Sequence, residues 1–254
     1  MSSKRERAYE RRRYEKWQQR RQVAEVRRRR QRVIAGSVVA ALVLVLGVVA
    51  AVALNNESSA SATPTATAVP TATATTSATD TSLVPDASLA QGRTWTGTIH
   101  LAQGDIGIEL DGAAAPQAVA NFVTLAGQGF FDTTTCHRLT TSRLYVLQCG
   151  DPEGTGQGGP GYTWGPIENA PTDDVYPAGT IAMARVSGDG ASMGSQFFLV
   201  YEDSQIPSDS AGGYTVFGHI TSGRDVLQAI ADAGTAEGTE TPVSDVIIEG
   251  VETQ

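Results

Sequence analysis

Cysteine and lysine are scarce in this sequence, and each shortage excludes a class of site. The 254 residues include two cysteines, too few for a disulfide-dense scaffold or for a zinc site built on four thiolates. The cysteines and the three histidines also lack the spacing of metal ligands, so we predict no metal site. Both lysines, Lys4 and Lys16, lie within the first 32 residues. The rest of the chain therefore has only arginines as permanently cationic side chains.

Charge divides the chain into a basic head and an acidic remainder. Residues 1–32 hold 14 Lys and Arg and four Glu, a net charge of +10, whereas residues 33–254 hold five Arg and 23 Asp and Glu, a net charge of −18. An acidic surface repels phosphates, which argues against nucleic-acid binding by the C-terminal part. For the head we favour a cytoplasmic topology signal that contacts anionic lipids, with nucleic-acid or ribosome binding as the alternative.

A long apolar run follows the basic head. Residues 33–54 contain no charged residue and no proline, and about 20 apolar residues in a helix span a bilayer core. We therefore predict a single transmembrane helix, with the N-terminus cytoplasmic and the C-terminal part outside the cell membrane, as the positive flank requires. A cleavable signal peptide is the alternative, because Ala51-Val52-Ala53 resembles a cleavage site.

Residues 55–93 consist mainly of Ser, Thr, Ala and Pro. Such a segment buries too little apolar surface to offset its chain entropy, so we predict a disordered stalk. The composition changes again at Thr94, and residues 94–254 are numerous enough to enclose one hydrophobic core. The sequence thus predicts four parts: 1–32, 33–54, 55–93 and 94–254.

Alternating patterns in the last part predict a mainly β domain. Thr94–Leu101 and residues 105–110 alternate with period two around a short turn, which indicates a hairpin. Pro116 opens one amphipathic helix, and Arg224–Ala233 forms a second that ends at Gly234. Many short strands with two helices indicate a closed antiparallel barrel. Further strands are expected at residues 135–139, 144–148, 179–184, 196–201, 215–220 and 246–251.

Two glycine-rich motifs imitate catalytic signatures. Residues 190–194 match G-x-S-x-G, but a strand pattern follows where a nucleophile elbow needs a helix. Gly154, Gly156 and Gly159 match G-x-G-x-x-G, but Pro160 follows where a phosphate-binding loop needs a helix. We interpret both as loops.

Five short segments of the last part occur in a characteristic order: Phe130-Phe131-Asp132, Cys136-His137-Arg138, Gln148-Cys149-Gly150-Asp151, Gly194-Ser195-Gln196-Phe197-Phe198 and Val216-Phe217-Gly218. Together they are similar to the motifs of the cyclophilins, the peptidyl-prolyl cis–trans isomerase family. The similarity covers nearly all of residues 94–254, and the basic head, span and stalk resemble those of membrane-anchored actinobacterial members. It implies a closed eight-stranded barrel capped by two helices.

The chemistry of proline isomerisation suits these residue types. Rotation about an X–Pro bond crosses a barrier of about 20 kcal/mol that amide resonance sets. A hydrogen-bond donor aimed at the proline nitrogen stabilises the twisted transition state, and arginine is a permanently charged donor. The resemblance implies that Arg138 is the catalytic arginine, that His137 flanks it and that Gln148 holds a substrate carbonyl. No cofactor is expected.

The resemblance also implies a peptide groove. It assigns the proline pocket to Tyr145, Val146, Phe198 and Ile206, and the rest of the groove to Gln196, Tyr214 and the backbone near Ala184 and Arg185. Since Phe197 and Phe198 alternate on one strand, we expect only one of them to line the pocket. The sequence departs from the family in having Cys136 for the usual Phe and Arg185 for the usual Asn, and in about six extra residues at 208–213.

Cys136 and Cys149 lie on strands that the resemblance pairs, so we predict a disulfide between them, with two buried thiols as the alternative. The resulting hypothesis is a membrane-tethered isomerase that accelerates the folding of exported or cell-surface proteins with Pro-containing segments. A module that binds proline segments without turnover, or a membrane scaffold, is the alternative. The sequence does not determine the oligomeric state.

Overall fold

The computed structural model describes residues 83–254. The predicted basic head, the predicted transmembrane helix at 33–54 and most of the predicted stalk lie outside these residues. Between residues 83 and 254, no helix combines the length and the apolar character needed to cross a bilayer.

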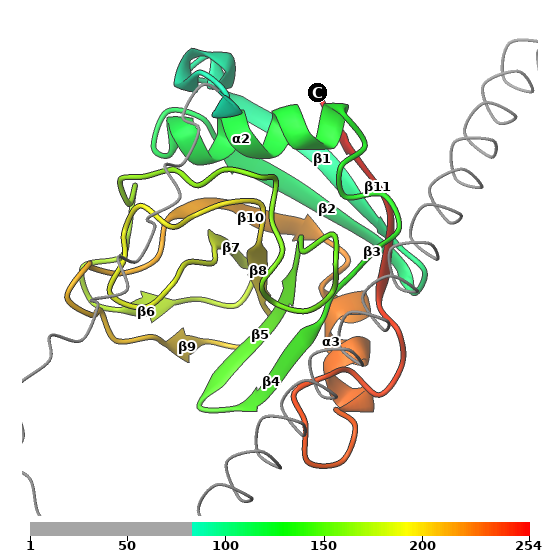
Figure 1. The fold of residues 1–254 in the computed structure, drawn as a ribbon. Helices are drawn as coiled ribbons and strands as arrows, with labels where there is room; N and C mark the ends of the chain where they lie inside the picture. Colours follow the sequence, from blue (N-terminus) through cyan, green and yellow to red (C-terminus); the bar gives the residue numbers. More distant parts are fainter. Residues whose placement is uncertain (1–82) are drawn as a thin grey trace, which may run out of the picture. The chain divides into compact units, whose positions relative to one another are not determined.

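The secondary structure of the described part is mainly β, with two α-helices and a short 3-10 helix (Figure 1). Its elements are η2 (Ala87–Ala90), β1 (Thr94–Leu101), β2 (Gly104–Asp111), α2 (Pro116–Gly127), β3 (Thr134–Thr135), β4 (Arg138–Ser142), β5 (Leu144–Cys149), β6 (Val175–Tyr176), β7 (Thr180–Met183), β8 (Phe197–Val200), β9 (Ser204–Gln205), β10 (Val216–Ser222), α3 (Arg224–Ala233) and β11 (Ile247–Thr253).

The hairpin and both helices lie where the sequence predicts them. β1 and β2 pair from Thr94 with Asp111 to Leu101 with Gly104, and α2 has Pro116 in its first turn. That turn has no side-chain cap of its own; instead the Glu168 carboxylate accepts hydrogen bonds from the backbone N–H groups of Gln117 and Ala118, both at 2.9 Å. An anion at this position suits the positive end of the helix dipole.

One antiparallel sheet forms the frame, with the strand order β3-β11-β1-β2-β10-β7-β8-β5-β4. β3 and β4 lie at the two ends of this order although they are consecutive in the chain. The sheet therefore curls, which brings its two end strands towards one another (Figure 1). Between them, Cys136 donates its backbone N–H to Val246 at 2.8 Å and His137 donates to Gln148 at 3.1 Å. This segment therefore bonds through Cys136 to the residue just before β11, and through His137 to β5.

This arrangement corrects the expected eight-stranded closed barrel. The sheet of residues 83–254 has nine strands, and no ladder joins β3 to β4. The strand expected at 135–139 is divided in two because its backbone changes partner at Cys136 and His137. The continuous chain closes the sheet where a ladder was expected. The pair β6-β9, which the sequence did not indicate, forms a separate two-stranded sheet.

The sheet has two apolar faces with different partners. Inside the curl, Phe122 of α2 packs against Phe131, Phe197 and Phe217, with ring centroids 5.1, 5.3 and 5.4 Å away. On the opposite face, a smaller cluster contains Phe198 of β8 and its neighbours on β5 and β7. Phe197 and Phe198 thus point to opposite faces, as the period of a strand requires, and only Phe198 is available to a surface pocket.

The predicted stalk ends earlier than Thr94. Residues 84–93 include η2, and Ala90 is fully buried. The Trp95 indole donates a hydrogen bond to the Ala90 carbonyl at 2.9 Å, and the Gln117 amide donates to the Pro85 carbonyl at 2.8 Å. These contacts to β1 and α2 make the segment part of the domain. The error arose because its small residues, read without tertiary partners, resemble in composition the predicted stalk before them.

Candidate active site

A pocket of about 430 Å³ opens on the outer face of β4, β5 and β8. Its wall combines polar side chains from β4 and β5 with apolar side chains from β5, β8 and the loops that follow β7 and β9. Nine predicted site residues line it: His137, Arg138, Val146, Gln148, Ala184, Arg185, Phe198, Ile206 and Tyr214.

The pairing of β4 with β5 brings the two main polar residues together. Arg138 is directly opposite Gln148 in the antiparallel register. An Nη of Arg138 donates to the Gln148 side-chain oxygen at 3.3 Å, and the Nε donates to the Glu240 carboxylate at 2.6 Å. The Arg138 side chain remains 38% exposed. Its guanidinium is therefore held at two of its nitrogen atoms while the remaining N–H groups stay available at the pocket.

Gln148 is fixed in turn by Gln196. The Gln148 amide nitrogen donates to the Gln196 side-chain oxygen at 2.8 Å, and the Gln196 amide nitrogen donates to the Gly158 carbonyl at 2.8 Å. Gln196 does not itself line this pocket, and its place in the wider peptide groove stays a prediction. Its side chain is directed towards Gln148 and the loop at 151–158, so it acts on the pocket through Gln148.

The loop at 151–158 is organised around one buried carboxylate. Asp151 is fully buried, and it accepts hydrogen bonds from the backbone N–H groups of Glu153, Thr155, Gly156 and Gly158. Burial alone would raise the pKa of Asp151, but these donors hold it below its usual value. A Cβ at residue 158 would overlap this carboxylate, which explains the glycine there. The glycine-rich motif is thus a structural loop, as interpreted from the sequence.

His137 lies between this loop and Arg138. Burial lowers the pKa of its imidazole, and the Arg138 charge lowers it further, while Asp151 acts in the opposite direction. The side chain is therefore a neutral wall of the pocket at pH 7.

Tyr145 does not line the pocket, which corrects its expected role. Side chains alternate along β5, so Leu144, Val146 and Gln148 face the pocket. Tyr145 points to the other face, where its ring packs edge-on against Tyr201 with the centroids 5.8 Å apart.

The sequence profile of the family described as "Cyclophilin type peptidyl-prolyl cis-trans isomerase/CLD" matches residues 96–253, more than half of the chain. The chain belongs to the cyclophilin family. It is 48% identical over 163 residues to a probable peptidyl-prolyl cis-trans isomerase B of Mycobacterium leprae, covering 59% of this chain and 53% of the relative. It therefore spans about half the length of that mycobacterial relative. A Bacillus subtilis peptidyl-prolyl cis-trans isomerase B is 44% identical over 139 residues, covering 54% of this chain and 91% of the relative.

Solved cyclophilin structures share the fold. A cyclophilin-type isomerase of Cryptosporidium parvum superposes with a TM-score of 0.56 and 26% identity, covering 64% of this chain and 98% of the other. A second structure, described as determined in the presence of the dipeptide Ala-Pro, gives a TM-score of 0.55 and 27% identity, covering 63% and 98%. The curled sheet with two helices is therefore the cyclophilin fold.

Within this cyclophilin site, the Arg185 side chain is buried and hydrogen-bonded to its surroundings. The side chain is completely inaccessible, and it pairs with Asp209 through two hydrogen bonds of 3.0 and 2.9 Å. It also donates to the carbonyls of Val186, Gly212 and Gly213. Its guanidinium lies 4.5 Å from the centre of the Tyr214 ring. Arg185 therefore anchors the extra residues at 208–213, which connect Ile206 to Tyr214 of the pocket lining.

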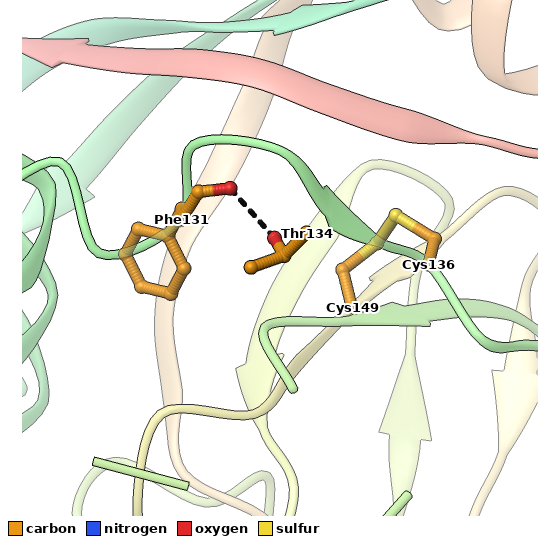
Figure 2. Close-up of a disulfide and its surroundings, with 4 residues drawn as sticks. All are labelled: Phe131, Thr134, Cys136 and Cys149. Atoms are coloured by element: carbon orange, nitrogen blue, oxygen red, sulfur yellow. Dashed lines mark hydrogen bonds between the residues drawn. A yellow bond between two sulfur atoms is a disulfide. The ribbon is translucent and has the colours of Figure 1, made fainter. Parts of the chain in front are cut away.

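The two cysteines stand behind the polar wall. Figure 2 shows the disulfide between Cys136 and Cys149, close to the turn in which the Thr134 hydroxyl donates to the Phe131 carbonyl at 2.6 Å. Cys136 belongs to the segment between β3 and β4, and not to a strand as expected. The bond joins the segment before Arg138 to the end of β5 just after Gln148.

Sequence reasoning missed five residues of the cyclophilin pocket: Leu144, Thr155, Gly156, Glu240 and Thr241. Leu144 follows from the alternation of β5. The others lie in loops whose path no local pattern specifies. In residues 83–254, no cluster of three or more His, Cys, Asp and Glu side chains is arranged to hold a metal ion. Residues 190–194 form a loop in which Ser192 bonds to the backbone of Asp189 and Val186.

Proposed function

We propose that this chain is a peptidyl-prolyl cis–trans isomerase whose catalytic residue is Arg138. One observation carries the proposal: a half-exposed guanidinium with unpaired N–H groups stands at the polar end of a small apolar pocket. Val146, Phe198 and Ile206 supply the apolar surface for a proline ring. The family membership and the names of the relatives support the same activity.

In this proposal the protein acts by hydrogen bonding alone, and no covalent bond breaks. As the X–Pro bond twists, amide resonance is lost and the lone pair becomes localised on the proline nitrogen. A donor from Arg138 stabilises that lone pair and gains nothing from the planar ground state. The Gln148 amide, held by Gln196, orients the neighbouring substrate carbonyl. The bound proline ring fixes one side of the bond while the other side rotates.

The proposed substrates are Pro-containing polypeptide segments. A related cyclophilin structure is described as determined in the presence of Ala-Pro, which supports a proline-sized pocket in this fold. The apolar run at 33–54 and the basic flank before it support a cell-membrane location with the isomerase domain outside the cytoplasm. In that location the clients would be exported or cell-surface proteins. The similarity of the head, span and stalk to those of membrane-anchored actinobacterial cyclophilins agrees with this.

The test is NMR exchange spectroscopy on a short X–Pro peptide, with the full chain in detergent micelles. We expect the native chain to accelerate cis–trans exchange and the Arg138→Ala variant to lose about 100-fold of kcat/KM, the usual effect of deleting one transition-state donor. Arg143→Ala is the matched control, because Arg143 is exposed at the β4–β5 turn and outside the pocket.

A second candidate, a module that binds proline segments without turnover, predicts a different result. Such a protein would bind the peptide and broaden its signals without accelerating exchange. A membrane scaffold would do neither. Native-like exchange by Arg138→Ala would reject the catalytic role of the arginine while leaving the isomerase activity standing.

A further inference from the structure

A carboxylate in the loop between α3 and β11 contacts the proposed catalytic arginine. Glu240 accepts a hydrogen bond from the Arg138 Nε at 2.6 Å, and Glu240 and Thr241 both line the pocket. We propose that Glu240 is a positioning residue that sets the orientation of the Arg138 guanidinium for isomerisation. This inference rests on the proposed catalytic role of Arg138.

The guanidinium is held at two points of its plane. Glu240 holds the Nε, and Gln148 accepts from one Nη at 3.3 Å. Within residues 83–254, these two bonds are the only hydrogen bonds of the Arg138 side chain, so three of the five N–H groups remain free. Because a guanidinium is rigid and planar, fixing two of its donors also fixes the direction of the remaining donors. Those donors are the ones that a proline nitrogen in the pocket can accept from.

Glu240 is itself fixed relative to the strand that carries the arginine. Its backbone carbonyl accepts from the backbone N–H of Leu139 at 2.6 Å, next to Arg138 on β4. The loop is closed on itself by hydrogen bonds from Ala236 to Thr241 at 2.9 Å and from Val243 to Gly234 at 3.0 Å. The carboxylate therefore approaches Arg138 from a backbone already tied to the same strand. This is the arrangement of an orienting group on a short, braced loop.

The exposure of the pair argues against a mainly stabilising role. The Arg138 and Glu240 side chains are 38% and 58% exposed, and exposed ion pairs contribute little to the free energy of unfolding. Orientation, by contrast, matters strongly for a directional donor, because small displacements of a catalytic group reduce rates many-fold. Removal of Glu240 should therefore affect turnover much more than folding. That separation makes the inference testable.

The experiment compares Glu240→Ala, Glu240→Gln and Glu237→Ala in the full chain in detergent micelles, by peptide exchange at several substrate concentrations. Glu237 is the matched control, being an exposed carboxylate in the same loop and outside the pocket. We expect Glu240→Ala to lower kcat about ten-fold with little change in KM or in melting temperature. Glu240→Gln should regain most of the rate, because its amide oxygen can still accept from the Nε. Glu237→Ala should resemble the native chain.

A combined Arg138→Ala/Glu240→Ala variant separates positioning from a structural effect. If Glu240 acts through Arg138, its removal adds no further loss in the Arg138→Ala background. A native rate for Glu240→Ala, a Gln variant as slow as the Ala variant, or an equal loss in both backgrounds would each overturn the inference. If Arg138→Ala is slow while Glu240→Ala is native-like, only the role of Glu240 fails. If Arg138→Ala itself is native-like, the underlying catalytic assignment fails.

Discussion

Two arginines, Arg138 and Arg185, line the same pocket, and they differ in how many of their N–H donors are unpaired. The Arg185 side chain is fully inaccessible, and it donates hydrogen bonds to Asp209 and to three backbone carbonyls. Arg138 is 38% exposed and has two hydrogen-bond partners. A saturated arginine is a structural crosslink, whereas an unsaturated one can stabilise a transition state. The number of unpaired donors, more than nearness to the pocket, distinguishes the proposed catalytic arginine from the structural one.

The largest effect on this comparison is expected from replacing Arg138 with lysine. Arg138→Lys keeps the positive charge but loses the planar fork that contacts Gln148 and Glu240 while pointing into the pocket. We expect kcat/KM to fall on the order of 30- to 100-fold, with an unchanged melting temperature. Peptide exchange and thermal unfolding measure the two quantities, and Arg143→Lys at the exposed turn is the control. A loss of stability with retained turnover would reverse the roles assigned here.

Replacing Arg185 with lysine should have the opposite effect, a loss of stability rather than of turnover. An ammonium has three donors and cannot replace all the bonds of Arg185, so part of the set formed by the Gly212 and Gly213 carbonyls and the Asp209 carboxylate loses its partner. We expect the free energy of unfolding to fall by about 2 kcal/mol, and KM to rise more than kcat falls. Urea denaturation measures the first effect. Arg224→Lys, an exposed change at the start of α3, should leave the midpoint unmoved.

Protonation of His137 gives a further test of the charge on Arg138. Because burial lowers the folded-state pKa of His137 below its usual 6.5, the unfolded chain binds the proton more tightly. Its contribution to stability is therefore complete above about pH 6.5 and is lost as the pH falls through the folded-state pKa. Since the Arg138 charge also lowers this pKa, Arg138→Ala should raise it. NMR titration of the imidazole signals tests this, and an unchanged or lower pKa in the variant would contradict it.

The smallest effect is expected at Tyr145, which packs against Tyr201 outside the pocket. Tyr145→Phe keeps the ring contact, so kcat/KM should change by less than about two-fold. Ile206→Ala, which removes apolar surface inside the pocket, should raise KM several-fold under the same assay. A strong effect of the Tyr145 change alone would return that side chain to the substrate site.

Local patterns predicted much of the fold because each element carried its own signal. The β1–β2 hairpin follows from alternation, and α2 and α3 follow from apolar spacing with Pro116 and Gly234 at their ends. The division of the strand at 135–139 had no local signal, since it depends on a change of hydrogen-bonding partner between β11 and β5. The ordered segment at 84–93 likewise had no local signal, because it is held by contacts to Trp95 and Gln117.

The site divides in the same way. Arg138 and Gln148 could be predicted because they lie in motifs, and their register places them together. Tyr145 was misplaced although the alternation of β5 around Val146 and Gln148 already assigned it to the other face. Glu240 could not be predicted, because 102 residues separate it from Arg138 and only the folded loop brings them together.

The disulfide has a consequence for contact between this protein and its proposed clients. Both cysteines are buried, at 0% and 1% exposure, and they are the only two in the chain. Thiol–disulfide exchange requires a thiolate to reach a sulfur atom directly, and here the folded surface blocks that approach. An unfolded client with free thiols could therefore be held without forming a mixed disulfide. Proline isomerisation and the oxidation of client cysteines would proceed as chemically independent events.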